Sequence, residues 1–109
     1  MQIFSQSAGQ ATNTISYSYR VPEDYYSKSA YLLISYVYSN EAATGHTLNV
    51  ALTGYEISST IANNSVVRTD GGQPFGKTII YEGTLQGGTI DVSLNGWDRD
   101  LLTVMLEVK

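Results

Sequence analysis

Apolar and polar residues alternate along several short stretches of the chain, which is the pattern of half-buried β-strands. In the stretch 14–21, the residues that share the apolar side are Ile15, Tyr17, Tyr19 and Val21. The alternation recurs in 47–53, 89–94 and 101–108. No stretch keeps the period of a helix for long, so the pattern predicts an all-β chain.

One stretch is apolar on both of its sides. Residues 29–39 are crowded with β-branched and aromatic side chains and contain neither Gly nor Pro. Such a run is typical of a strand in the middle of a sheet. We predict that it is the central strand. The remaining strands each supply one apolar face, which favours two sheets stacked over a common core.

Turn-forming residues separate these stretches and a few weaker ones. The breaks fall at Pro22, Gly54, 70–74, Gly87 with Gly88, and Asn95 with Gly96, and the weaker strands are 57–61, 66–68 and 78–82. Roughly seven to nine short strands joined by such turns predict an antiparallel β-sandwich of the jelly-roll type.

The length of 109 residues indicates a single domain, 1–109, which buries roughly two-thirds of its unfolded surface. Residues 5–13 are rich in Ser, Gln, Gly and Thr and are predicted to form a loop, so 1–13 is interpreted as an extended N-terminal arm. The chain has no Cys, and its first residues do not resemble a signal peptide. We therefore expect synthesis in the cytoplasm of the producing cell.

The net charge of −4 and the scattered basic residues bear on partners. Binding to a phosphate backbone requires several cations on one surface, so nucleic acid and anionic membrane are not expected partners. No apolar run approaches the roughly 18 residues of a membrane span.

The residues that could carry chemistry are few. His46 is the only His and lies after Gly45, without the glycines that surround a nucleophilic Ser. Asp98 and Asp100 could bind calcium with a further carboxylate from Asp70 or Asp91, but a charged turn explains the pair as well. We predict no catalytic residue, no metal and no cofactor.

Aromatic residues at predicted loop positions are the clearest candidates for contact with a ligand. Tyr25, Tyr26, Tyr55 and Trp97 lie in predicted loops, and Asp98 follows Trp97. Aromatic rings beside hydrogen-bonding groups suit a carbohydrate, but Tyr and Trp are also enriched at subunit interfaces. Both interpretations stay open for these five residues.

The outward sides of two strands are also apolar. The expected interface residues there are Tyr31, Leu33, Val37, Leu101 and Met105. A small sandwich has only one core layer, so this apolar surface requires a partner. We predict a dimer or trimer of the chain, or docking on a larger protein assembly.

The layout of apolar and turn residues resembles two groups of jelly-roll proteins. The residues concerned are Tyr19, Val21, Pro22, the run 31–36, Leu48, Val50, Leu52, Gly54, Leu85, Gly87, Ile90 and Val92. This order is similar to that of sugar-binding modules of the galactose-binding-like class and of trimeric heads of the tumour-necrosis-factor and complement type. Thr53 precedes Gly54 where the sugar-binding modules usually carry Asn, so no sugar site is transferred.

In size, absence of Cys, composition and predicted jelly-roll pattern, the whole chain resembles the small cement or decoration proteins of tailed bacteriophage capsids. The resemblance implies a structural virion protein that clamps neighbouring capsid subunits as a dimer or trimer, with residues 2–13 as its arm. We therefore expect a non-catalytic capsid decoration subunit located in the virion. The alternative is a carbohydrate-binding jelly-roll module that uses the loop aromatics.

Overall fold

The computed structural model describes residues 1–9, 14–38, 47–67, 75–95 and 101–109. In these residues the chain is all-β apart from one turn of 3-10 helix, η1 (Glu23–Tyr25). The strands are β1 (Gln2–Gly9), β2 (Thr14–Arg20), β3 (Ser29–Tyr38), β4 (Thr47–Leu52), β5 (Tyr55–Val67), β6 (Phe75–Leu85), β7 (Thr89–Asn95) and β8 (Leu101–Val108).

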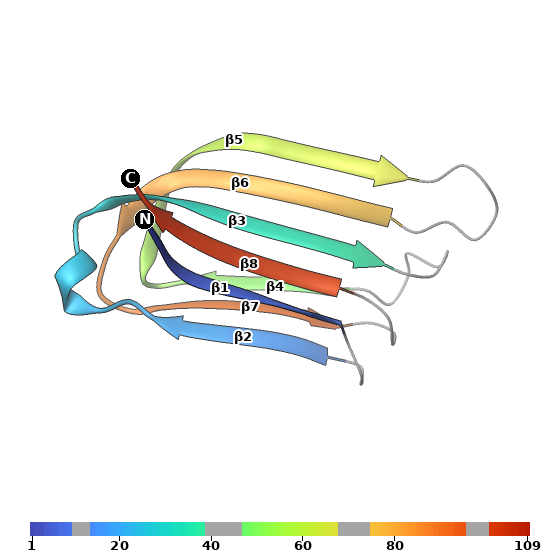
Figure 1. Cartoon of the computed structure of the whole chain (residues 1–109), viewed down its shortest axis with the longest axis horizontal. Coiled ribbons are helices and arrows are strands. Elements are labelled where there is room, and N and C mark those ends of the chain that lie inside the picture. Colours follow the sequence, from blue (N-terminus) through green and yellow to red (C-terminus); the bar gives the residue numbers. More distant parts are fainter. Residues whose placement is uncertain (10–13, 39–46, 68–74, 96–100) are drawn as a thin grey trace.

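The strands form two antiparallel sheets that lie along the long axis of the molecule (Figure 1). The larger sheet has the order β1-β8-β3-β6-β5, and the smaller has the order β2-β7-β4. A single core cluster draws its buried side chains from both sheets. The fold is therefore sandwich-like, as the alternating pattern predicted.

The core follows from the strand period of two. In β3 the inward residues Ala30, Leu32 and Ile34 are fully buried, and in β8 their counterparts are Leu102, Val104 and Leu106. The register places Ile34 opposite both Ile79 and Val104, so their side chains lie on the same face. The smaller sheet supplies Ile15, Ile90, Val92 and Leu94. The prediction that residues 29–39 form the central strand is confirmed, because β3 is the middle strand of the five.

Two elements differ from the sequence prediction. Residues 5–9 were expected in a loop, but they belong to β1, which pairs with β8 from Gln2 to Gly9. Residues 57–61 and 66–67 are in a strand as predicted, but the break predicted between them is wrong, because 55–67 is one long strand, β5. Arg68 lies outside the described residues. Two register shifts along β5, at Ile57/Ser59 and Thr60/Ala62, break its alternation and hide it in the sequence. The role of 1–13 as an arm stays a prediction.

The turns at one end of the sandwich are tied together by backbone hydrogen bonds. The Gly54 N–H donates to Thr89 O (2.9 Å), and the Val21 N–H donates to Gly88 O (3.0 Å). Gly88 has a φ of 140°, and a Cβ there would lie 2.7 Å from the carbonyl carbon of Thr53. Only Gly suits this position, because the backbone of the turn after β4 approaches it so closely.

Candidate interaction surfaces

The outer face of the larger sheet carries an apolar patch. We define this outer face by the residues of β3, β5, β6 and β8 whose side chains point away from the core. Tyr31, Leu33 and Val37 alternate with the buried residues of β3 and are only half-buried. Met105 of β8 lies directly opposite Leu33 and is also half-buried. No described part of the chain covers this face.

A shallow hollow lies in the outer face. It measures about 250 Å³ and is lined by Tyr31, Leu33, Ile61, Ile80, Met105 and Glu107. Ile61 reaches the hollow because it occupies the second irregularity of β5, between Thr60 and Ala62. Its side chain is 53% exposed, so the hollow has an apolar wall open to solvent. Such a surface suits contact with another apolar surface.

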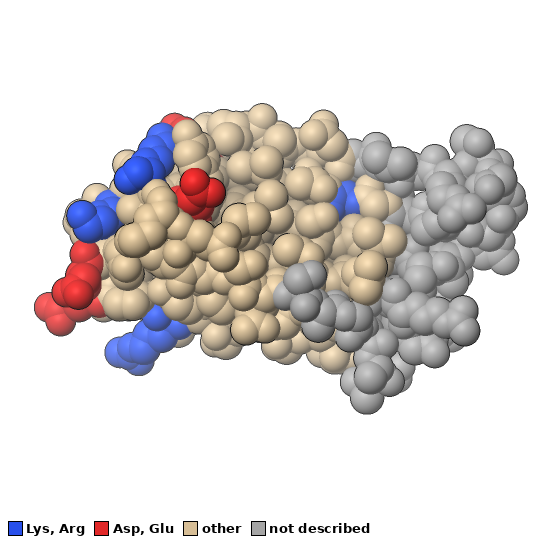
Figure 2. All heavy atoms as spheres, in the orientation of Figure 1, with Lys and Arg blue, Asp and Glu red and all other residues tan. Residues whose placement is uncertain are grey.

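Charged groups lie at one end of the outer face. The Lys109 ammonium is 2.8 Å from a carboxylate oxygen of Glu82 and 4.9 Å from the ring centre of Tyr31. The hydrogen bond to Glu82 is the main cause of the raised pKa of Lys109. In Figure 2 most of the visible charged residues gather toward the end at which both chain termini lie, and a broad uncharged area follows. The charged residues in this view are thus concentrated at one end of the molecule.

The structure places the predicted interface residues together on this face. Leu33 is opposite Met105, and Val37 is opposite Leu101, which is 48% exposed. The sequence prediction did not include Ile61 or Ile80, although both line the hollow. The sequence could have assigned Ile80 to the outer face, because adjacent strand residues point to opposite faces and Ile79 is buried. Ile61 could not, because its orientation depends on the irregular pairing of β5.

The described members of the predicted group of loop aromatics differ in exposure. Tyr55 is the first residue of β5 rather than a loop residue, and it is 2% exposed. Tyr25 packs against the core, whereas Tyr26 is 40% exposed and its ring lies beside Gly87. Trp97 and Asp98 lie outside the described residues, as do His46, Asp70 and Asp100. The prediction that Tyr55 contacts a ligand or a subunit is wrong, because its side chain has almost no exposed surface.

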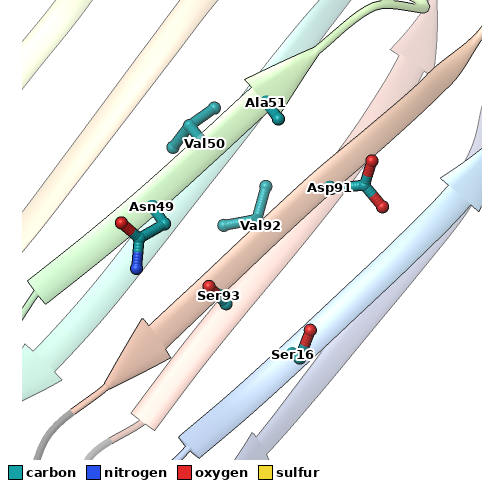
Figure 3. A pocket seen from close by; sticks show the side chains of 7 residues that line it. All are labelled: Ser16, Asn49, Val50, Ala51, Asp91, Val92 and Ser93. Carbon is teal, nitrogen blue, oxygen red and sulfur yellow. The ribbon is translucent and has the colours of Figure 1, made fainter.

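The outer face of the smaller sheet is polar. A hollow of about 280 Å³ is lined there by Ser16, Asn49, Val50, Ala51, Asp91, Val92 and Ser93 (Figure 3). The Thr89 hydroxyl donates to a carboxylate oxygen of Asp91 (2.6 Å). Hydrogen bonds from Ser18 and Thr89 lower the pKa of Asp91. The hollow of the smaller sheet is therefore more polar than the hollow of the larger sheet.

Two other kinds of site are absent from the described residues. No group of three or more His, Cys, Asp or Glu side chains in them could hold a metal ion. No helix in the same residues has the length and apolar character to cross a membrane. The first finding does not include Asp70, Asp98 and Asp100, for which the sequence suggested calcium, because they lie outside the described residues.

No protein-family model matches the chain, and the comparisons with curated proteins and with solved structures gave no match.

Proposed function

We propose that the chain is a non-catalytic structural subunit, a capsid decoration or cement protein, which oligomerises and docks on a protein lattice through the outer face of its larger sheet. The observation that carries the proposal is the uncovered apolar face around Leu33 and Met105. The capsid setting is supported by the resemblance in size and composition. On this proposal the mature location is the virion.

The outer face is large enough for such a contact. Strands lie about 4.8 Å apart and rise about 3.3 Å per residue, so four strands of about eight residues cover roughly 500 Å². Two such faces together would bury roughly 1,000 Å², which is near the lower limit for a specific interface. Contact between two copies would therefore reach the size of a small specific interface, and the lattice contact would add to it.

We also infer that the fold is a variant of the jelly roll. A jelly roll is a long antiparallel hairpin that is wrapped into two sheets, so that its strand pairs are nested. The support is the pairing of β1 with β8, β2 with β7 and β3 with β6. The innermost pair is split, because β4 stays in the smaller sheet and β5 joins the larger one.

A carbohydrate-binding module is the second candidate function. The observation that favours it is the hollow in the outer face of the smaller sheet, where Asp91, Asn49 and Ser93 offer donors and acceptors for sugar hydroxyls. The site would then lie on a strand face and not on the loops. A glycan array tests this candidate with Asp91→Ala as the control, and it is retired if no glycan binds the unmodified chain.

The proposed assembly is tested by changing the outer face alone. Leu33→Lys combined with Met105→Lys places two charges in the proposed interface. Ser16→Lys is the matched control, because Ser16 is exposed on the opposite outer face. In sedimentation velocity, the unmodified chain and the control should form oligomers and the double variant should be a monomer. An unchanged distribution for the double variant would overturn the proposal.

A further inference from the structure

The sandwich is closed along one side, where β1 and β8 meet β2. The ring centres of Phe4 and Tyr19 lie 4.7 Å apart and join β1 to β2. The Tyr17 hydroxyl donates to Leu102 O (3.2 Å) and joins β2 to β8. Aromatic side chains therefore fill the space between the two sheets on this side.

The opposite side, between β4 and β5, is open. Val50 of β4 lies directly opposite Val92 of β7, so both point toward the core, but Val92 is 1% exposed and Val50 is 39% exposed. In β5, Tyr55 is 2% exposed, whereas Ile57, two residues further along the same face, is 42% exposed. Val50 and Ile57 thus point toward the space between the sheets but are exposed to solvent on this side.

The cause is the unequal number of strands in the two sheets. After the turn at Thr53–Gly54, β5 joins β6 in the larger sheet and leaves β4 as an edge of the smaller one. Because β1 and β8 already lie against β2, the extra width of the larger sheet falls on the β5 side. No strand of the described chain fills the position beside β4 and opposite β5.

We propose that this open side accepts one extended segment of a partner polypeptide, which pairs with β4 as a fourth strand of the smaller sheet. Among the described residues, no strand pairs with the edge of β4 that faces away from β7, and an added strand would bond the backbone N–H and C=O groups of this edge. The same segment would cover Val50 and Ile57. The smaller sheet would then match the width of the larger one more closely.

The surroundings specify the chemistry of the segment. Its inward positions, every second residue, must be apolar to pack on Val50 and Ile57. The residues around them, Leu48, Leu52 and Thr60, are uncharged, so a charge on the inward side of the segment would be buried without a partner. β4 has six residues, and a segment of similar length is about 20 Å long. The fitting partner is an uncharged extended peptide with alternating apolar residues.

A second folded copy does not fit the open side if its β4 pairs antiparallel with that of the first copy in one continuous sheet. If β4 of two copies paired across a two-fold axis, β5 of each copy would lie over the neighbouring smaller sheet. It would then overlap the space that the larger sheet of that neighbour already fills. A single strand avoids this overlap. The added segment must therefore be extended beyond the body of its own protein.

The experiment uses a fluorescein-labelled peptide of alternating valine and threonine, about as long as β4, and measures fluorescence anisotropy. A peptide with the same residues in two blocks is the control. The alternating peptide should bind saturably, and the block peptide at least about tenfold more weakly. Val50→Asp and Ile57→Asp should each weaken binding by at least about tenfold. Ile61→Asp, on the same strand but on the outer face, should bind normally.

Hydrogen exchange on the unmodified chain gives a second measurement that is independent of whether the variants fold. The peptide should protect amides of β4. Protection of β1 or β2 instead, equal binding of both peptides, or no binding of either would overturn the proposal. A Val50→Asp variant that dissociates oligomers without any peptide would show that a second copy occupies the open side, which also overturns it. The Leu33 and Met105 variants test the outer face separately.

Discussion

The Tyr55 hydroxyl lies 2.8 Å from the carbonyl oxygen of Ala30, a residue on the central strand and two strands away in the same sheet. It also lies 3.2 Å from the carbonyl oxygen of Tyr81. The ring passes over Gly83 of β6, where a Cβ would lie 2.8 Å from the ring. Through these two hydrogen bonds, Tyr55 attaches the start of β5 to β3 and β6 of the larger sheet.

Tyr55→Phe should lower the free energy of unfolding by about 1 kcal/mol, because it removes a buried hydrogen bond and leaves the shape of the ring unchanged. Urea unfolding followed by circular dichroism measures the change. Tyr26→Phe is the control, since the Tyr26 side chain is exposed, and it should have little effect. Equal stability of the Tyr55 variant and the unmodified chain would show that this hydrogen bond does not stabilise the fold.

Alkaline pH should destabilise the protein through the same residue. Burial, followed by the charge of Glu82, raises the pKa of Tyr55 well above its ordinary value of 10.0. The folded state then holds a proton that the unfolded state releases, so this contribution to stability is complete below about pH 10 and is lost as pH rises toward the folded pKa. The loss between about pH 10 and 11 should be smaller in Tyr55→Phe. Identical pH profiles would contradict this assignment.

Gly83→Ala tests the close approach of β5 to β6. A Cβ on Gly83 would overlap the carbonyl oxygen of Glu56, which is part of the backbone and cannot rotate away. Because β5 must shift, we expect a loss of about 2 to 3 kcal/mol in stability. Gly87→Ala is the control, since its Cβ would lie 3.4 Å from the Tyr26 ring. A thermal unfolding curve for Gly83→Ala that matches the unmodified chain would contradict the close approach.

Asp91 should titrate below its ordinary pKa of 3.8, because the hydroxyls of Ser18 and Thr89 stabilise its charged form. The lowered pKa stabilises the folded state at pH values above the pKa that Asp91 has in the unfolded chain. This stabilisation is lost as the pH falls through the pKa of Asp91 in the folded state. The pKa measured by carboxyl carbon NMR should rise toward 3.8 in Thr89→Ala. Since Asp91 is only half-buried, the effect on stability should be small. A pKa that does not change in Thr89→Ala would show that Ser18 alone causes the shift.

Much of the fold was predictable from the period of two in the sequence. Residues 29–39 were apolar on both sides, and β3 is the central strand. In β8 the alternation assigned Leu102 and Val104 to the core, where both are fully buried. Patterns of this kind succeed where a strand is regular and one of its faces is covered.

The prediction failed where irregular pairing or tertiary contact decides the structure. The two irregularities of β5 change which face its residues occupy, so Ile61 was not recognised as part of the outer face. Tyr55 was expected in a loop because it follows Gly54, but its hydrogen bond to Ala30 draws it into the core. The polar residues of β1 concealed a strand that is held by its pairing with β8. None of these contacts is local in sequence.

The molar mass of the unmodified chain in solution tests the central claim most directly. Sedimentation equilibrium should be carried out over a wide range of micromolar concentrations and at two salt concentrations. Because the proposed interface is mainly apolar, we expect a mass of two or three times 11.9 kDa that depends little on salt. A mass of 11.9 kDa at every concentration would contradict the claim that the outer face of the larger sheet joins copies of this protein.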